Sequence, residues 1–208
     1  MAAGTVIRSF ASPAANPYGI AFDGRTLWEC GILEQLIYQI DPATGTVIRS
    51  FASPLAAPKG LVFDGRTLWH VPNGALTIYG IDPATGKVIR SFAGPGAGIP
   101  TGLTFDGRYL WYCCQFTQLI YQIDPATGTV IRSFAGPKIN PRGLAWDGRT
   151  IYHCVADTRL IYQIDPATGT VIRSFASPAG NPTGLVYDGR TLWNVDHGAQ
   201  VIYQLSVA

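Results

Sequence analysis

Residues 19–51 read GIAFDGRTLWECGILEQLIYQIDPATGTVIRSF, and near copies of this stretch follow one another along the chain. They define five blocks, residues 4–44, 45–85, 86–127, 128–168 and 169–208, of which the third is one residue longer through Gly96, Ala97 and Gly98. A period of about 41 residues is typical of propellers and solenoids. The repeat therefore limits the fold to a few architectures before any single residue is considered.

Each block contains four short segments that are rich in β-branched and aromatic residues, which in the first block are residues 19–22, 26–30, 36–41 and 46–51. Such segments favour strands. The Asp-Gly-Arg and Asp-Pro-Ala-Thr-Gly segments between them supply the positive-φ glycine and the preset proline that tight turns need. The apolar residues show no sustained period of 3.6, so the sequence predicts no helix. The sequence predicts an all-β, five-bladed β-propeller with four antiparallel strands per blade, forming one domain over residues 1–208.

The two ends of the chain predict how the ring closes. Residues 5–10 repeat the fourth-strand sequence of a block, whereas the chain stops soon after a third-strand sequence at residues 201–205. We expect the N-terminal strand to complete the last blade, because this pairing removes an open sheet edge.

Composition narrows the classes of partner. The chain has 208 residues, 47% hydrophobic content and a net charge of +2 with interspersed charges, which favours one core and argues against nucleic-acid binding. The sequence contains no run of 18 apolar residues, so it predicts no membrane-spanning helix. The first four residues lack the features of a signal peptide, so we expect a cytoplasmic location if the chain is expressed as it stands, and the natural compartment is left open. We also expect a monomer.

Several recurring residues have a structural interpretation. The aromatic positions Trp28 and Tyr38 recur in every block, and we interpret both sets as packing between blades rather than as a sugar-binding ladder. The Asp and Arg of Asp-Gly-Arg are interpreted as turn-forming and surface charges. Three of the four cysteines share one repeat position and are interpreted as core residues, while Cys114 is the best candidate for an exposed thiol.

Differences between the blocks are concentrated in two connections. The first-to-second connection is always Asp-Gly-Arg, and the third-to-fourth is Asp-Pro-Ala-Thr-Gly in every complete copy, whereas the other two vary. Successive turns of an antiparallel meander lie at alternating ends, so the variable connections should share one end of the ring. Neutral drift of loops is one explanation. The constancy of the framework, including the Arg of Val-Ile-Arg-Ser-Phe, favours recent amplification followed by selection on one end, or consensus design with a chosen end.

The variable windows supply the candidate binding residues, since loops on a rigid scaffold commonly carry function. We expect a small molecule or a peptide as the ligand. The residues expected to face the axis are Tyr18, Lys59, Thr101, Arg142 and Thr183, and those expected just outside them are Glu29, His70, Tyr112, His153 and Asn194.

The repeat Gly-Leu-x-x-Asp-Gly-Arg-Thr-Leu-Trp, followed by Ile-Tyr-x-Ile-Asp-Pro-Ala-Thr-Gly, resembles the blades of the YVTN, NHL and streptogramin-lyase propellers. The blade count, chain length and strand permutation also resemble the glutamine cyclotransferases (glutaminyl cyclases), which form pyroglutamate from N-terminal glutamine. That resemblance implies a functional acidic residue at Glu29, after Trp28. The family's Gln-Leu-Thr-Trp segment is replaced here by His-Val-Pro-Asn at residues 70–73, and its Asn in the fourth blade by His153.

Other chemistries remain open. Glu29 in a cavity could act as a general acid or base, and Glu29, His70 and His153, with Asp157, Asp196 or His197 nearby, are suitable metal ligands by type. No nucleophile elbow, phosphate loop or zinc signature is present, so no cofactor is expected. A structural scaffold with no ligand is a further alternative.

Overall fold

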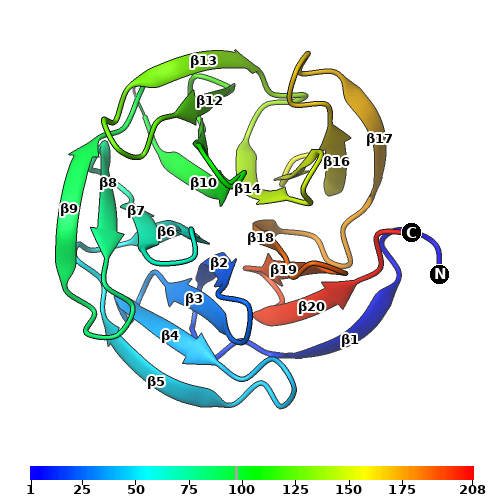
Figure 1. Ribbon diagram of the computed structural model, residues 1–208. Coiled ribbons are helices and arrows are strands. Elements are labelled where there is room, and N and C mark those ends of the chain that lie inside the picture. The colour runs from blue at the N-terminus through cyan, green and yellow to red at the C-terminus, as the bar shows by residue number, and fades with distance from the viewer. Residues whose placement is uncertain (97) are drawn as a thin grey trace.

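The computed structural model describes residues 1–96 and 98–208, so Ala97 of the longer third block lies outside the described residues. The described chain forms five four-stranded antiparallel sheets arranged in a ring, with no helix (Figure 1). No helix that could span a membrane is therefore found in the described part of the chain. The predicted all-β, five-bladed propeller is confirmed.

Each blade runs from an inner strand near the axis to an outer strand at the rim (Figure 1). The inner strands are β2 (Pro17–Phe22), β6 (Pro58–Phe63), β10 (Pro100–Phe105), β14 (Pro141–Trp146) and β18 (Pro182–Tyr187). The second strands are β3 (Leu27–Gly31), β7 (Leu68–Pro72), β11 (Leu110–Cys114), β15 (Ile151–Val155) and β19 (Leu192–Asp196). The third strands are β4 (Leu36–Ile40), β8 (Thr77–Ile81), β12 (Leu119–Ile123), β16 (Leu160–Ile164) and β20 (Val201–Leu205). The outer strands are β5 (Val47–Ala52), β9 (Val88–Ala93), β13 (Val130–Ala135), β17 (Val171–Ala176) and β1 (Val6–Ala11).

The last blade combines both ends of the chain, as predicted. Its strand order is β1-β20-β19-β18, and β1 pairs antiparallel with β20, with Ser9 opposite Tyr203. The two termini accordingly lie close together at the rim (Figure 1). The first strand of the sequence therefore closes the ring.

The Asp of Asp-Gly-Arg does more than form a turn. Gly24 has a φ of 92°, as the turn requires. Asp23 Oδ1 accepts a hydrogen bond from the Thr26 amide at 2.6 Å, and its Oδ2 accepts one from Trp28 Nε1 at 2.8 Å. The indole is thereby tied to the turn at the constant end. The same bond recurs from Trp69, Trp111 and Trp193.

The Arg of Val-Ile-Arg-Ser-Phe ties neighbouring blades together. Arg49 Nε donates to Gln39 Oε1 at 2.7 Å within its blade, and Nη1 donates to the Ala84 carbonyl of the next blade at 2.7 Å. Its guanidinium carbon lies 5.3 Å from the centroid of the Trp28 ring. This arginine is constant for a structural reason, so its constancy does not discriminate between drift and selection, contrary to our interpretation of the sequence.

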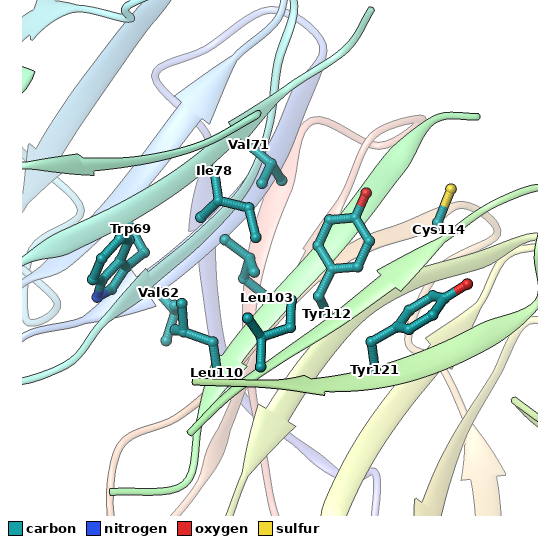
Figure 2. Packing of buried hydrophobic residues seen from close by; sticks show 10 residues of the cluster. Val62, Trp69, Val71, Ile78, Leu103, Leu110, Tyr112, Cys114 and Tyr121 are labelled. Atoms are coloured by element: carbon teal, nitrogen blue, oxygen red, sulfur yellow. The ribbon is translucent and has the colours of Figure 1, made fainter. Parts of the chain in front are cut away.

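The core lies between blades. Figure 2 shows one such cluster, in which Trp69, Val71 and Ile78 of the second blade pack against Tyr112 and other residues of the third. Five clusters of this kind fill the five interfaces between blades. The recurring Trp positions are buried, which confirms the packing interpretation.

The cysteines belong to this core. The interpretation of Cys30, Cys113 and Cys154 as core residues is confirmed by their burial. The expectation of an exposed thiol at Cys114 is wrong, because its exposed fraction is 0%. Cys114 follows Cys113 at the end of β11, where its side chain joins the cluster between the second and third blades.

Glycines let the inner strands approach one another around the axis. A Cβ atom built on Gly19 would collide with the carbonyl oxygen of Lys59, and one built on Gly184 with that of Tyr18. Between the five strands, the axial space narrows to a cavity of about 10 Å³, which holds at most one water molecule. The core of the ring is therefore nearly filled at this level.

Candidate functional site

A larger cavity of about 220 Å³ lies where the inner strands begin. Its walls come from the variable connections and from residues near the start of four inner strands, β2, β6, β14 and β18. The lining residues are Tyr18, Ile32, Lys59, Arg142, Asn181, Thr183 and His197.

Tyr18 is the central side chain of this cavity. The Lys59 ammonium nitrogen lies 3.6 Å from the centroid of its ring, and the Arg142 guanidinium carbon lies 5.5 Å from it. Arg142 Nη1 also donates a hydrogen bond to the Tyr18 hydroxyl. A ring face attracts cations, because its quadrupole is negative above the plane. Residues from the first, second and fourth blades are thus brought together across the axis.

The electrostatics of the cavity are unbalanced toward positive charge. Lys59 is only 8% exposed, and burial lowers its pKa to about 8. Burial also lowers the pKa of Arg142, although the Asp157 carboxylate opposes this shift. The pKa of His197 is lowered by burial and further by the charges of Lys59 and Arg142, which keeps its imidazole neutral at pH 7.

Thr101 and Thr183 contribute hydroxyl groups that are already used. Thr183 Oγ1 donates to the carbonyls of Pro17 and Val195, at 3.2 and 3.3 Å. Thr101 Oγ1 lies 3.4 Å from the Cys113 carbonyl and lines the narrow axial space instead of the larger cavity. All five residues expected to face the axis therefore border one of these two spaces, and four of them meet in the larger one.

The five residues expected just outside the axial set do not line the larger cavity. Each is fully buried in the second strand of its blade. Two of them, His70 and His153, place Nδ1 at 3.0 and 3.2 Å from the carbonyls of Gly60 and Gly143 in their own inner strands. The complete set is Glu29, His70, Tyr112, His153 and Asn194. These side chains lie within the blades rather than in the mouth of the ring.

The serine that follows the preceding outer strand contacts three of these five side chains, those of Glu29, His70 and Asn194. Ser12 Oγ donates to Glu29 Oε2 at 2.8 Å, and Ser53 Oγ lies 3.0 Å from His70 Nε2. The equivalent residue before His153 is Gly136, and His153 Nε2 has no partner among the described residues. The contact is therefore present at His70 and absent at His153, although both blades have histidine at this position.

Glu29 has an unusual environment for a carboxyl group. Its Oε1 is buried without a hydrogen-bond partner in the described structure. Burial raises its pKa to about 8; the Ser12 hydrogen bond opposes this shift, and the Glu34 charge adds to it. The side chain is protonated at neutral pH, but it is not part of the cavity wall. A role for Glu29 as general acid or base was considered for a side chain that faces a cavity, and Glu29 does not line this one.

The suggested metal ligands do not converge. Among residues 1–96 and 98–208, no group of three or more His, Cys, Asp or Glu side chains is arranged to hold a metal ion. Burial lowers the pKa values of His70 and His153 to about 4, and their Nδ1 atoms are directed at backbone carbonyls. Glu29, His70 and His153 are separate buried groups on different blades.

Sequence reasoning did not place Ile32, Asn181 and His197 in the cavity wall, although all three lie in the variable windows. The windows indicated the region. Only the folded connections show which of their residues turn toward the axis, because the variable loops have no repeat from which orientation can be inferred.

No protein-family model and no curated protein matches the chain. Among solved structures, it is similar to glutaminyl cyclase from Myxococcus xanthus, with a TM-score of 0.82 and 16% identity over 98% of this chain and 97% of that chain. It is also similar to virginiamycin B lyase from Staphylococcus aureus, with a TM-score of 0.59 and 22% identity over 96% and 69% of the two chains. These likenesses confirm the resemblance in architecture to glutaminyl cyclases and streptogramin lyases, and at such identities they show a shared fold alone.

Proposed function

We propose that this chain is a binding protein, in which a repeated propeller scaffold holds a small molecule or part of a peptide in the cavity at its variable end. The observation that carries this proposal is the 220 Å³ cavity, whose wall combines residues that differ from blade to blade. Turns at the opposite end are uniform and already satisfy their polar groups internally. Binding sites are expected where a rigid scaffold presents individual side chains.

The size of the cavity limits the ligand. Pockets for drug-sized molecules usually enclose about 300–1,000 Å³, which is more than the 220 Å³ found here. A small metabolite fits this space, as does one terminus or one side chain of a peptide. The remainder of a longer ligand would lie on the variable loops outside.

A ligand screen tests this proposal. We expect some members of a panel of anionic, neutral and cationic fragments and short peptides to raise the melting temperature of the protein. Asn181→Trp should abolish the effect by filling the cavity, whereas Asn73→Trp, on a variable loop outside the cavity wall, should preserve it. If no compound of any class stabilises the protein, a scaffold without ligand is the better description.

The second candidate is a glutamine cyclotransferase-like enzyme. It is supported by the likeness to M. xanthus glutaminyl cyclase over nearly the whole of both chains and by the raised pKa of Glu29. A protonated carboxyl group can serve as a general acid, but substrate would have to reach a side chain that is fully buried. Mass spectrometry of a peptide with N-terminal glutamine would detect loss of ammonia. Loss of this turnover in Glu29→Gln, with peptide binding retained, would support the enzyme.

The near identity of the blades concerns the origin of the chain. We propose recent amplification of one blade, or consensus design, because the framework segments of the five blocks are nearly identical in sequence. Replacing both variable windows of every blade with their average sequence tests whether the loops have a function. A scaffold without ligand would keep its stability and lose no interaction.

A further inference from the structure

We propose that the cavity is an oxyanion site, in which the Lys59 ammonium and the Arg142 guanidinium together hold a carboxylate or phosphate group of a small molecule. This inference rests on the proposed function, since it requires that the cavity takes a ligand. It goes further by assigning the chemical class of the group that binds.

The balance of charge is the first argument. Seven residues line the cavity, and they include two cations but no Asp or Glu. The nearby acids lie outside the wall: Asp157 Oδ1 accepts from Asn140 Nδ2 at 2.7 Å, and Asp196 Oδ2 accepts from the Asn181 backbone amide at 2.7 Å. Of these two, Asp157 acts on Arg142 only through its charge. Within the described residues, neither Lys59 nor Arg142 forms an ion pair. Burying like charges together is costly unless a counter-charge is supplied, and an anion in the cavity supplies it.

The unused donors are the second argument. Lys59 is more than nine-tenths buried, and among the described residues its ammonium forms no hydrogen bond and packs on the ring of Tyr18. The Arg142 guanidinium donates one hydrogen bond, to the Tyr18 hydroxyl, while its Nε is buried without a partner in the described structure. An ammonium has three donors and a guanidinium has five. An oxyanion accepts several hydrogen bonds at once, and those from charged donors are the strong ones.

The walls around the cations suit a small organic anion. Both cations contact the ring of Tyr18, which restrains their positions before any ligand binds. The polar residue Asn181 and the apolar residue Ile32 line the same space. A charged head with a short uncharged body therefore matches the wall better than a cation or a wholly apolar molecule, and a preorganised site loses less entropy on binding.

Isosteric pairs of probes test the inference. Binding of acetate and of inorganic phosphate is measured by calorimetry and by the melting temperature at constant ionic strength, with acetamide as the uncharged counterpart of acetate. We expect saturable binding of at least one anion and weaker binding of acetamide. In Lys59→Met the anion affinity should fall about tenfold or more, the usual effect of removing a charged hydrogen bond. In Lys138→Met, which removes an exposed charge from a variable connection, it should be unchanged.

The outcomes separate this inference from the proposed function. Saturable binding by acetate alone, phosphate alone or both supports the oxyanion site and identifies which group it prefers. Equal binding of acetate and acetamide, or equal anion affinity in Lys59→Met and Lys138→Met, overturns it while leaving a ligand-binding cavity. Failure of every probe class, including neutral and cationic fragments, overturns both. Arg142→Gln provides a second variant, which should also weaken the anion.

Discussion

Glu29 is a carboxyl group that the fold keeps neutral. It has one hydrogen-bond partner, the Ser12 hydroxyl, no exposure, and a pKa that burial raises to about 8. In the unfolded chain the same group ionises near its ordinary value of 4.5. Between these two values the native state binds the extra proton, so the free energy of unfolding falls as the pH rises from about 4.5 to about 8.

The first prediction concerns the pH dependence of stability. Glu29→Gln replaces the ionisable group with a neutral one of the same shape that can still accept the Ser12 hydrogen bond. By pH 7 the wild-type protein should have lost roughly 3 kcal/mol relative to its stability below pH 4.5, at about 1.4 kcal/mol per pH unit. The variant should not show this loss. Urea unfolding of both proteins from pH 4 to pH 9 measures the difference.

A matched control uses the neighbouring acid. Glu34 is exposed and lies five residues farther along the chain. Glu34→Gln should keep most of the wild-type slope, because Glu34 contributes to the Glu29 pKa only as a minor cause. Parallel stability curves for the wild type and Glu29→Gln would show that Glu29 does not titrate in this range.

At the scale of single residues, the sequence predicted positions better than environments. It placed Tyr18 and Lys59 toward the axis, and they do border the cavity. It also placed Glu29 near a cavity, whereas the side chain packs inside the blade. One signal was present but unused: a serine precedes Glu29 and His70 at a repeat position that becomes glycine before His153. This position varies within an otherwise constant segment, which indicates that it belongs to the variable end of the ring.

At the scale of elements, one repeated contact is interrupted. In the first blade Gln39 Nε2 donates to Thr26 Oγ1 at 2.9 Å, and Gln39 Oε1 accepts from Arg49 at 2.7 Å. The equivalent residue of the second blade is Gly80, in the middle of β8. Arg90 there keeps only its bond to the Ala126 carbonyl of the next blade, at 2.8 Å. The third strand of this blade thus lacks a link that the other blades have.

The second prediction is that Gly80→Gln stabilises the protein. The substitution removes the entropic disadvantage of glycine in a strand and restores two hydrogen bonds, which together should raise the free energy of unfolding by about 1–2 kcal/mol. A Cβ atom at this position would lie 2.9 Å from Arg90 Cγ, 3.1 Å from Thr67 Cγ2 and 3.2 Å from Trp69 Cζ3, so these side chains must shift slightly to admit the glutamine. Chemical denaturation measures the change.

Gly80→Ala separates the two contributions, since alanine adds a Cβ atom without restoring any hydrogen bond. The glutamine variant should be more stable than the alanine variant. If the two are equal, the Gln-to-Arg link contributes nothing to the stability of a blade.

Elements themselves were well predicted. In the first block the strands begin and end within two residues of the expected limits. The Asp-Gly-Arg and Asp-Pro-Ala-Thr-Gly turns mark where the strands at the constant end stop and start. The purpose of their side chains was not predicted. Asp23 was expected to form a turn, but it also binds Trp28 from five residues away, and the contact of the exposed Arg49 with the next blade was not predicted. Both contacts depend on distances across folded strands, which no local pattern records.

At the scale of the whole molecule, β1 closes the ring. It supplies the outer strand of the last blade, and Arg8 donates to Gln204 Oε1 at 2.7 Å and to the Ala43 carbonyl of the first blade. Phe10 packs on Trp193, with ring centroids 5.8 Å apart. One short segment therefore joins the last blade to the first.

The third prediction is that deletion of residues 1–10 opens the ring. It should expose β20 as an edge strand, lower the melting temperature and promote association through that edge. Light scattering and thermal unfolding measure both effects. Deletion of residues 1–3 alone, which precede β1, should leave the protein monomeric and close to wild-type stability. A stable monomer after the longer deletion would contradict closure by β1.

The architecture of the whole was predictable because five similar blocks can satisfy their strand edges in few ways. The ligand was not. A sequence repeat identifies positions at which the blades have the same residue, whereas the cavity is lined by positions at which they differ. Tyr18, Lys59 and Arg142 occupy the same repeat position in three blades, and they meet only when the ring is formed.

The glycines at the axis determine how a molecule could enter and leave the cavity. Because the inner strands approach so closely, the space behind the cavity shrinks to the size of one water molecule. The cavity is thus open at the variable end and does not continue along the axis as a channel. Whatever enters must leave by the same mouth, so an occupant and its replacement cannot pass each other. If the cavity takes a ligand as proposed, exchange would proceed one molecule at a time, and a partner bound over the variable loops would block it.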